Sequence, residues 1–172
     1  MDFSILAKNR YSVRSFKSDA VEEDKIAEIL DAGLIAPSAC NFQPWRIYVA
    51  KSEEARKKLS GICRFTFDAP LIMVICYDNN LTWKNKRIPG HSSGETDASI
   101  LTTHMILKAS ELGIGSCWVG CFNPTEVKEA LGISEDSVVV SALVPMGYPK
   151  EDSAPHEMHT KYRDKSETVF EV

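Results

Sequence analysis

Two short stretches contain the residues with the clearest chemical potential. The first, residues 10–14, places the guanidinium groups of Arg10 and Arg14 on either side of Ser12. Guanidinium groups bind phosphate through parallel hydrogen bonds, and their fixed positive charge also favours an electron-rich ring nearby. Because short arginine clusters are common in solvated turns, the cluster alone does not decide between an anion site and an ordinary basic surface.

The second stretch is the polar loop of residues 36–45, which leads directly into a candidate strand. Two prolines restrict φ near its ends and make it rigid. Between them, Ser38, Asn41 and Gln43 supply donors and acceptors suited to the polar edge of a planar ring. Taken alone, the loop also fits an ordinary connection from a helix to a strand.

Hydrophobic periodicity predicts helices and strands that are interspersed along the chain. The predicted helices cover residues 2–9, 22–35, 52–60, 93–112 and 124–131. The predicted strands cover residues 46–50, 71–77, 116–119, 138–144 and 168–172. The segments 78–90 and 150–165 are polar and are predicted to be irregular, the first as a loop or small lid. We therefore expect an α+β fold in one domain, residues 1–172, built as a three-layer α/β/α sandwich around a central mixed or antiparallel sheet.

The helix predicted at residues 93–112 carries the strongest signals. Ser92 and Glu95 have the spacing of a capping box, and Gly113 is a natural stop. Its apolar residues spread over more than one face, which is typical of a helix buried on two sides. In so small a domain, we expect the second side to be covered by a partner subunit.

Composition limits the classes of function. The chain has 172 residues and a formal net charge of −4, which argues against general binding of nucleic acid. No apolar run approaches the roughly 20 residues of a membrane helix. The first ten residues lack the basic start and long apolar centre of a signal peptide, so we expect a cytoplasmic protein that does not bind membranes.

Cysteine and histidine residues are interpreted as mainly structural. The chain has five cysteines, an odd number without a C-x-x-C pair, so we expect reduced thiols that pack as small hydrophobic groups. Cys40 and Cys121 lie in polar or glycine-containing loops and are the alternatives for a reactive thiol. His156 and His159 have no evident third ligand, so no metal site is predicted.

The order of the motifs is more specific than any one of them. An R-x-S-x-R cluster, an amphipathic helix, the motif P-S-x-x-N-x-Q-P-W and then a strand resemble the N-terminal signature of the FMN-dependent nitroreductase family. Later segments agree with this resemblance: the glycine-rich residues 112–120, the G-x-P motif at 147–149 and the basic residues of 161–163. The similarity extends from about residue 3 to residue 171.

The resemblance implies an FMN site shared by two subunits of an intertwined homodimer. One subunit would bind FMN, and above all its phosphate, through Arg10, Tyr11, Ser12 and Arg14, together with Lys161 and Arg163. The other would contact the isoalloxazine ring through Pro37, Ser38, Ala39 and Asn41. Val119 and Gly120 would lie near flavin N5, and Arg14 would stabilise the negative charge of the reduced flavin. The C-terminal segment, about residues 165–172, would cross to the partner.

The implied activity is transfer of hydride from NADH or NADPH through flavin N5 to an electron-poor small molecule, a nitroaromatic or quinone, by a ping-pong mechanism. Two alternatives remain open: a protein that stores or senses flavin with little turnover, and a specialised flavin enzyme acting on one metabolite. The chain lacks the long helical insertion of larger relatives, and Val119 stands where many have an acidic residue. Lys84, Lys86 and Arg87 are the candidates for a ring-contacting cation in mid-chain.

Overall fold

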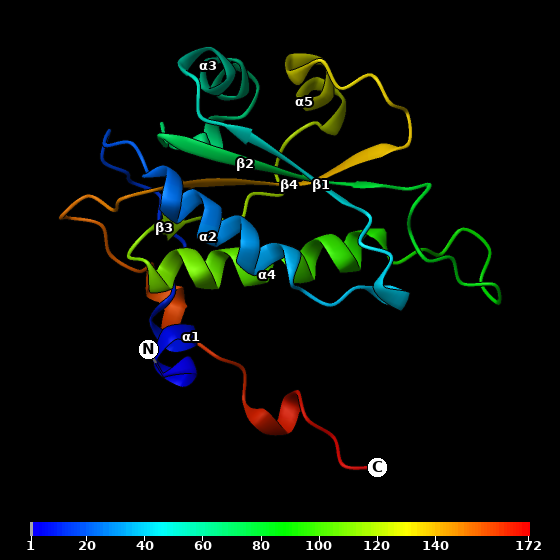
Figure 1. The fold of residues 1–172 in the computed structure, drawn as a ribbon. Coiled ribbons are helices and arrows are strands. Elements are labelled where there is room, and N and C mark those ends of the chain that lie inside the picture. The colour runs from blue at the N-terminus through cyan, green and yellow to red at the C-terminus, as the bar shows by residue number, and fades with distance from the viewer. Residues whose placement is uncertain (1) are drawn as a thin grey trace.

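The computed structural model describes residues 2–172 and forms three layers around one sheet (Figure 1). The sheet has the strand order β1-β2-β4-β3, with β1 (Trp45–Ala50), β2 (Leu71–Asp78), β3 (Gly115–Ser116) and β4 (Val138–Gly147). One face is covered by α3 (Glu53–Ile62) and α5 (Pro124–Leu131), and the other by α2 (Glu23–Leu34) and α4 (Gly94–Glu111). The short helix α1 (Phe3–Asn9) lies outside α4. The predicted α+β sandwich is confirmed.

The sheet itself is antiparallel throughout. β1 pairs with β2, β2 with β4, and β3 with β4, each in antiparallel register. The parallel component of the expected mixed sheet is a single isolated bridge between Ser12 and Ser116. The N-terminal arginine segment is therefore attached to the edge strand β3.

Strand β2 is buried on both faces, as its continuous apolar run predicts. Met73 and Ile75 point into the cluster formed with α2 and α4, whereas Ile72 and Val74 point into the cluster on the side of α3 and α5. All four are completely inaccessible to solvent. This alternation is what a central strand between two helical layers requires, and it makes β2 the rigid middle of the molecule.

The capping box predicted at Ser92 and Glu95 is wrong. Helix α4 has Ser93 as its N-cap, but that side chain makes no capping hydrogen bond. The Ser93 hydroxyl donates to Asp97 instead, at 2.6 Å, and Glu95 accepts a hydrogen bond from the Ser141 hydroxyl. The next residue is a glycine, Gly94, and a Cβ atom at this position would lie only 2.4 Å from the Tyr77 ring. Tertiary contacts, not local capping, fix the start of this helix.

Helix α4 has one buried side and one partly open side. Leu101, Met105 and Ala109 are completely buried against α2 and the sheet. Thr103 is exposed, and Leu107 is only partly buried. None of the helices in residues 2–172 is long and apolar enough to cross a membrane.

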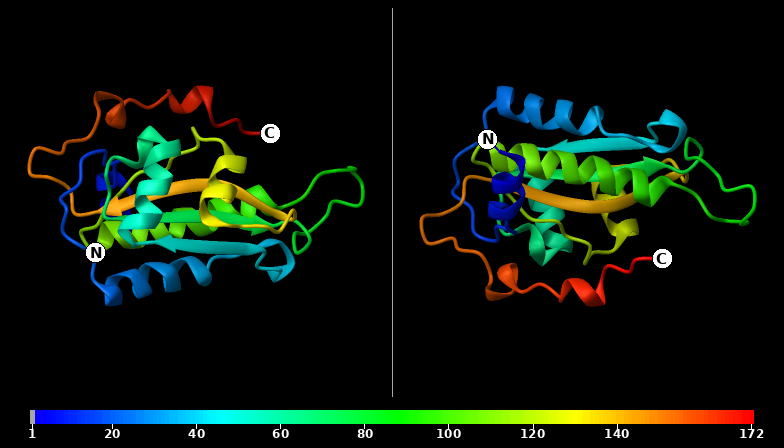
Figure 2. Two further views of the ribbon diagram at one scale, coloured as in Figure 1. Left: turned by 90° about the horizontal axis from the view of Figure 1, so that it is seen from above. Right: turned by 90° about the horizontal axis from the view of Figure 1, so that it is seen from below.

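The strand predicted at residues 168–172 is wrong for the single chain. After β4 the chain forms two short 3₁₀ turns, Glu157–Thr160 and Lys165–Glu167, and is otherwise irregular. It runs along the outside of the molecule to an exposed C-terminus (Figure 2). A strand needs neighbouring backbone donors and acceptors, and residues 168–172 pair with no strand in the described chain.

Candidate functional site

The arginine segment is held in an extended conformation beside two strands. The Val13 N–H donates to the carbonyl of Ser116 at 2.9 Å, and the Lys17 N–H donates to the carbonyl of Tyr148 at 2.8 Å. Val13 is buried at 2% exposure in the small cluster that also contains Phe16. Because successive side chains alternate in an extended chain, this burial turns the side chains of neighbouring residues outward.

The outward side chains line a hollow of about 320 Å³. Its lining residues are Arg10, Tyr11, Ser12, Arg14, His156, Met158 and His159. No carboxylate lines it, and neither arginine forms an ion pair with any residue of 2–172. The arginine contact that is present is a long hydrogen bond, 3.4 Å, from Arg14 Nη1 to the Ser12 carbonyl. Two unneutralised guanidinium groups at one opening are suited to bind an anion.

A second hollow of about 210 Å³ adjoins the first, because Arg14 lines both. Its other lining residues are Phe65, Phe67, Cys117, Trp118, Val119, Gly120 and Cys121. Of the two residues predicted near flavin N5, Val119 already donates its N–H to the Leu143 carbonyl at 2.9 Å. The Gly120 N–H has no backbone acceptor in the part of the chain described, and a Cβ at Gly120 would meet no atom within 4 Å. Gly120 is therefore the residue with a free donor and open space in front of it.

Cys117, which the sequence predicts only as a packing residue, lines the second hollow together with Arg14. Burial raises the pKa of its thiol, and the nearby guanidinium of Arg14 and hydroxyl of Ser12 offset part of that rise in pKa. The residue is 5% exposed. Its place beside Arg14 follows from the pairing of residues 12–13 with Ser116, which no local pattern reveals.

The loop that contains the predicted ring contacts has an unusual backbone. Cys40, Asn41 and Gln43 have φ angles of 53°, 56° and 50°, in the left-handed region. The other non-glycine residues with positive φ are Phe67 and Asp68, beside the second hollow. Non-glycine residues with this conformation are uncommon, and strained ones cluster at functional sites. The strain marks the same two regions that the motifs indicate.

Asp97 fixes this loop to the start of α4. Its Oδ1 accepts the Ala39 N–H at 2.9 Å, and its Oδ2 accepts the Ser93 hydroxyl at 2.6 Å. The residue is only 2% exposed. Its position in the first turn of α4 also lets the helix dipole favour its negative charge. Its role as a link between loop and helix depends on tertiary structure.

Within the loop, side chains replace missing backbone partners. Ser38 Oγ accepts the Gln43 N–H at 3.0 Å, and Asn41 Oδ1 accepts a hydrogen bond from Gln43 Nε2 at 2.8 Å. The Asn41 N–H donates to the Ser38 carbonyl at 3.0 Å. These bonds hold residues 38–43 in one shape.

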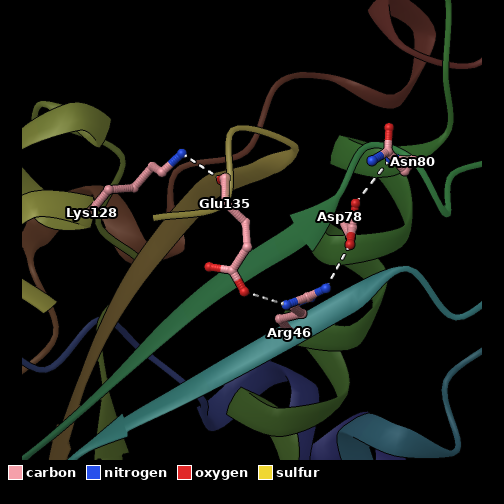
Figure 3. Close-up of polar contacts among 5 residues, drawn as sticks. All are labelled: Arg46, Asp78, Asn80, Lys128 and Glu135. Atoms are coloured by element: carbon pink, nitrogen blue, oxygen red, sulfur yellow. Dashed lines mark hydrogen bonds and ion pairs between the residues drawn. The ribbon is translucent and has the colours of Figure 1, made fainter. Parts of the chain in front are cut away.

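A second polar network fixes the far end of the loop, where β1 begins (Figure 3). The Asp78 N–H donates to the carbonyl of Pro44 at 2.7 Å, and the Asp78 carboxylate pairs with Arg46 at 2.7 Å. Arg46 also pairs with Glu135 at 3.2 Å. The Asn80 N–H lowers the pKa of Asp78 most, with further contributions from the Ser137 hydroxyl and Arg46.

The two predicted halves of the flavin site lie at opposite ends of α4 (Figure 1). Asp97, in the first turn, holds Ala39. Ser110, in the last turn, shares a cavity with Arg10. Because Asp97 and Ser110 are 13 residues apart and a helix rises 1.5 Å per residue, these two attachment points are about 20 Å apart along α4. One chain does not bring its own arginines and its own ring-contact loop together.

Lys161 and Arg163 lie outside both hollows in this chain. Lys161 pairs with Glu157 at 3.8 Å and Arg163 with Glu167 at 3.2 Å, and both side chains are largely exposed. Two histidines of the polar segment 150–165, His156 and His159, lie beside Arg10 and Arg14 instead. Across residues 2–172, no group of three His, Cys, Asp or Glu side chains converges as metal ligands would.

Tyr11 holds this histidine segment in place. Its hydroxyl donates to the Ser153 carbonyl at 3.2 Å, and its ring meets His159 edge-on with centroids 6.3 Å apart. His159 Nε2 also lies 3.1 Å from the Lys8 carbonyl. Residues 148–150 pair with residues 15–17, and this pairing brings the histidine segment beside the arginines. Such a long-range pairing leaves no local pattern in the sequence.

Comparisons with known proteins show the family to which this chain belongs. The model of the nitroreductase family matches residues 7–64 and 61–148. A protein of Archaeoglobus fulgidus, provisionally named NADH dehydrogenase/NAD(P)H nitroreductase, is 34% identical over 162 residues, covering 89% of this chain and 88% of the relative. The crystal structure of a nitroreductase family protein from Clostridium difficile superimposes with a TM-score of 0.91 at 36% identity, covering 99% and 98% of the two chains. The chain therefore belongs to the nitroreductase family.

Proposed function

We propose that two copies of this chain form two equivalent FMN sites, each built from the arginine end of one copy and the loop end of the other. The chain is an FMN-dependent NAD(P)H oxidoreductase. The observation that carries the shared site is the separation of residues 10–14 from residues 37–41 by the length of α4. Within one chain the arginine segment and the ring-contact loop are therefore attached about 20 Å apart along α4, which supports a site completed by a second copy.

The residues present fit FMN. The hollow around Arg10 and Arg14 offers two unpaired cations and no carboxylate, which suits a dianionic phosphate. The adjoining hollow offers aromatic walls, the open face of Gly120 and its free N–H, which suit a planar ring with acceptor atoms. A relative from Bacillus subtilis, 28% identical over 160 residues, is named FMN reductase [NAD(P)H].

When bound, FMN supplies hydride chemistry at N5, from NAD(P)H to an electron-poor acceptor such as a nitroaromatic or quinone. Arg14 holds a fixed positive charge at the junction of the two hollows, where it favours a ring that gains negative charge. Gly120 offers a backbone donor that needs no side-chain rearrangement. The chain's contribution is to bind, orient and exclude water.

The outer surfaces of the chain fit a dimer. The partly open side of α4 and the C-terminal segment both expose apolar groups, including Tyr162 at 77% and Phe170 at 74%. Residues 165–172 make few contacts with their own chain and are free to cross to a partner. Such a crossing also gives Lys161 and Arg163 a route to the phosphate that they lack here.

Stopped-flow absorbance of the FMN-loaded protein tests this function. We expect the flavin to bleach on mixing with NADH or NADPH and to regain its colour when a quinone or nitroaromatic is added. A flavin that binds tightly but is not bleached by either nicotinamide would indicate a storage or sensing protein. Bleaching with recovery by only one metabolite among many acceptors would indicate a specialised enzyme.

A further inference from the structure

The segment between β2 and α4 carries a local excess of positive charge. Residues 79–94 contain Lys84, Lys86 and Arg87 and no aspartate or glutamate, in a chain whose formal net charge is −4. His91 lies in the same segment. A local excess of cations on an acidic protein attracts anions to one place on its surface.

This segment is a small ordered hairpin. Lys84 and Ser92 form an antiparallel bridge, the Asn85 N–H donates to the His91 carbonyl at 3.0 Å, and the Ser93 N–H donates to the Trp83 carbonyl at 3.0 Å. Gly90 has a φ of +79° at the turn, which favours glycine. The hairpin, residues 83–93, projects beyond the end of the sheet and the helices (Figure 2).

The cations of the hairpin differ in what they bind. Lys84 Nζ donates to the carbonyl and to the side chain of Asn79, at 2.7 and 2.6 Å, so its ammonium group is held at the base. Lys86 and Arg87 are exposed, and within residues 2–172 their side chains form no hydrogen bond or ion pair. The tip therefore presents two unneutralised cations to solvent.

The base of the hairpin is joined to the ring-contact loop by one carboxylate. Asp97 accepts both the Ala39 N–H of the loop and the Ser93 hydroxyl at the end of the hairpin. The hairpin and the loop therefore share a buried attachment point and leave the body of the protein at the same end of α4 (Figure 1). A flavin that contacts the loop therefore lies at the same end of the chain as the hairpin.

We propose that Lys86 and Arg87 bind the phosphate groups of the nicotinamide dinucleotide that reduces the flavin. This inference rests on the proposed function, because it requires the loop of residues 37–41 to lie at a flavin shared with the other copy. The nicotinamide ring must lie on the flavin, so its anionic diphosphate extends outward toward solvent. An acidic protein repels that diphosphate unless cations stand near the opening, and the hairpin supplies them.

Binding of nucleotides to the FMN-loaded protein tests the proposal without depending on turnover. Dissociation constants of NAD⁺, NADP⁺ and ADP-ribose would be measured by calorimetry for the wild-type protein and for a Lys86→Gln, Arg87→Gln double variant. Two exposed charge pairs predict that the variant binds about two- to thirtyfold more weakly. The difference should shrink as salt concentration rises. A greater loss for NADP⁺ than for NAD⁺ would assign the additional phosphate to the same tip, whereas equal losses would assign the diphosphate alone.

A matched control separates this local effect from net charge. Lys57→Gln, Lys58→Gln removes the same charge from α3, on the opposite face of the sheet, and should leave all three dissociation constants unchanged. Flavin reduction by NADH would also be compared with reduction by 1-benzyl-1,4-dihydronicotinamide, which has the same hydride-donating ring and no phosphate. The hairpin variant should slow flavin reduction by NADH at subsaturating concentrations. Its reduction by saturating NADH and by the phosphate-free analogue should be unchanged.

Four outcomes would overturn the proposal. Equal nucleotide affinities for the hairpin variant and wild type would show that the tip does not bind phosphate. Unchanged nucleotide affinities together with weaker reoxidation by an acidic redox protein would assign the tip to protein docking. If neither NADH, NADPH nor the phosphate-free analogue reduces the wild-type protein, the proposed function is wrong as well. If all three compounds reduce the flavin and the hairpin variant behaves as the wild type does, the hairpin proposal alone is wrong.

Discussion

The two ends of α4 solve different physical problems. At the C-terminal end, the arginine segment has ordinary extended geometry and contributes charge that its own chain does not neutralise. At the N-terminal end, the loop of residues 38–43 has a strained backbone, and the carboxylate of Asp97 and the hydroxyl of Ser38 accept two of its N–H groups. One end offers electrostatic attraction and the other offers a fixed shape. A ligand with an anionic tail and a planar head needs both.

The largest expected effect is on the charged end. Arg10→Ala should weaken FMN binding about ten- to a hundredfold, because a charge-assisted hydrogen bond contributes roughly 1.5–3 kcal/mol. Riboflavin, which lacks the phosphate, should lose little affinity. Fluorescence titration of the apoprotein with each flavin measures both.

Arg163→Ala extends the same comparison to the C-terminal segment. In the dimer we expect a selective loss of FMN affinity over riboflavin affinity, as for Arg10→Ala. An equal loss for both flavins would show that the residue holds the fold or the ring instead of the phosphate.

The next effect concerns the shaped end. Asp97→Ala removes the carboxylate that accepts two hydrogen bonds, so the Ala39 N–H and the Ser93 hydroxyl lose their partner inside the protein. We expect the free energy of unfolding to fall by about 1–3 kcal/mol. Denaturant titration measures it, and Ser93→Ala, which removes only one donor, should cost less. Equal stability of Asp97→Ala and wild type would mean that the loop is held by its internal hydrogen bonds alone.

A smaller, pH-dependent effect is expected where β1 begins. The pKa of Asp78 is lower in the folded protein than in the unfolded chain, so its carboxylate stabilises the fold at pH values above the unfolded value of about 3.9. This stabilisation is lost as pH falls through the folded pKa. The difference in stability between wild type and Asp78→Asn should be constant from about pH 7 to pH 5 and should decrease below about pH 4. A difference that is unchanged in acid would contradict the assignment.

Much of the fold was predictable because its signals are local. The periodicity of α2 and the apolar runs of β2 and β4 place these elements within a few residues of their observed limits. The capping box at Ser92 and Glu95 failed because Ser93 is the N-cap of α4 and Glu95 accepts a hydrogen bond from the distant Ser141. The strand at 168–172 failed because strand pairing is not a local property.

The candidate site was predictable only in part, for the same reason. The arginine cluster and the polar loop are short motifs that can be recognised in the sequence. His156, Cys117 and the linking role of Asp97 depend on segments far apart in the chain that meet in three dimensions. The residue types indicate which segments could bind a ligand. That the two halves lie at opposite ends of α4 is known only from the length and direction of this helix in the structure.

Cysteine labelling offers the smallest perturbation, because one exposed thiol lies in the ring-contact loop and another lines the second hollow. Cys40 and Cys121 are exposed, whereas burial raises the pKa of Cys76 to about 12. A maleimide at neutral pH should therefore label Cys40 and Cys121 and leave Cys76 unmodified, as peptide mass spectrometry would show. Bound FMN should protect both reactive thiols. Protection of Cys121 alone would contradict a site that uses the loop end.

Complementation between two defective chains tests the shared site most directly. One chain would carry Arg10→Ala and Arg14→Ala, and the other Ser38→Ala and Asn41→Gly, with glycine chosen because Asn41 has a φ of 56°. Different affinity tags allow the heterodimer to be isolated after co-expression. If sites are shared, one site of the heterodimer collects all the lesions and the other has none.

The heterodimer should then bind one FMN per dimer and recover up to half of the wild-type activity, while each mutant homodimer binds none. Separation of the subunits on dilution should abolish the recovered activity, because a shared site depends on its interface. A verified heterodimer that binds no FMN would show that each site is confined to one chain, and the two ends of α4 would then not belong to one shared flavin site.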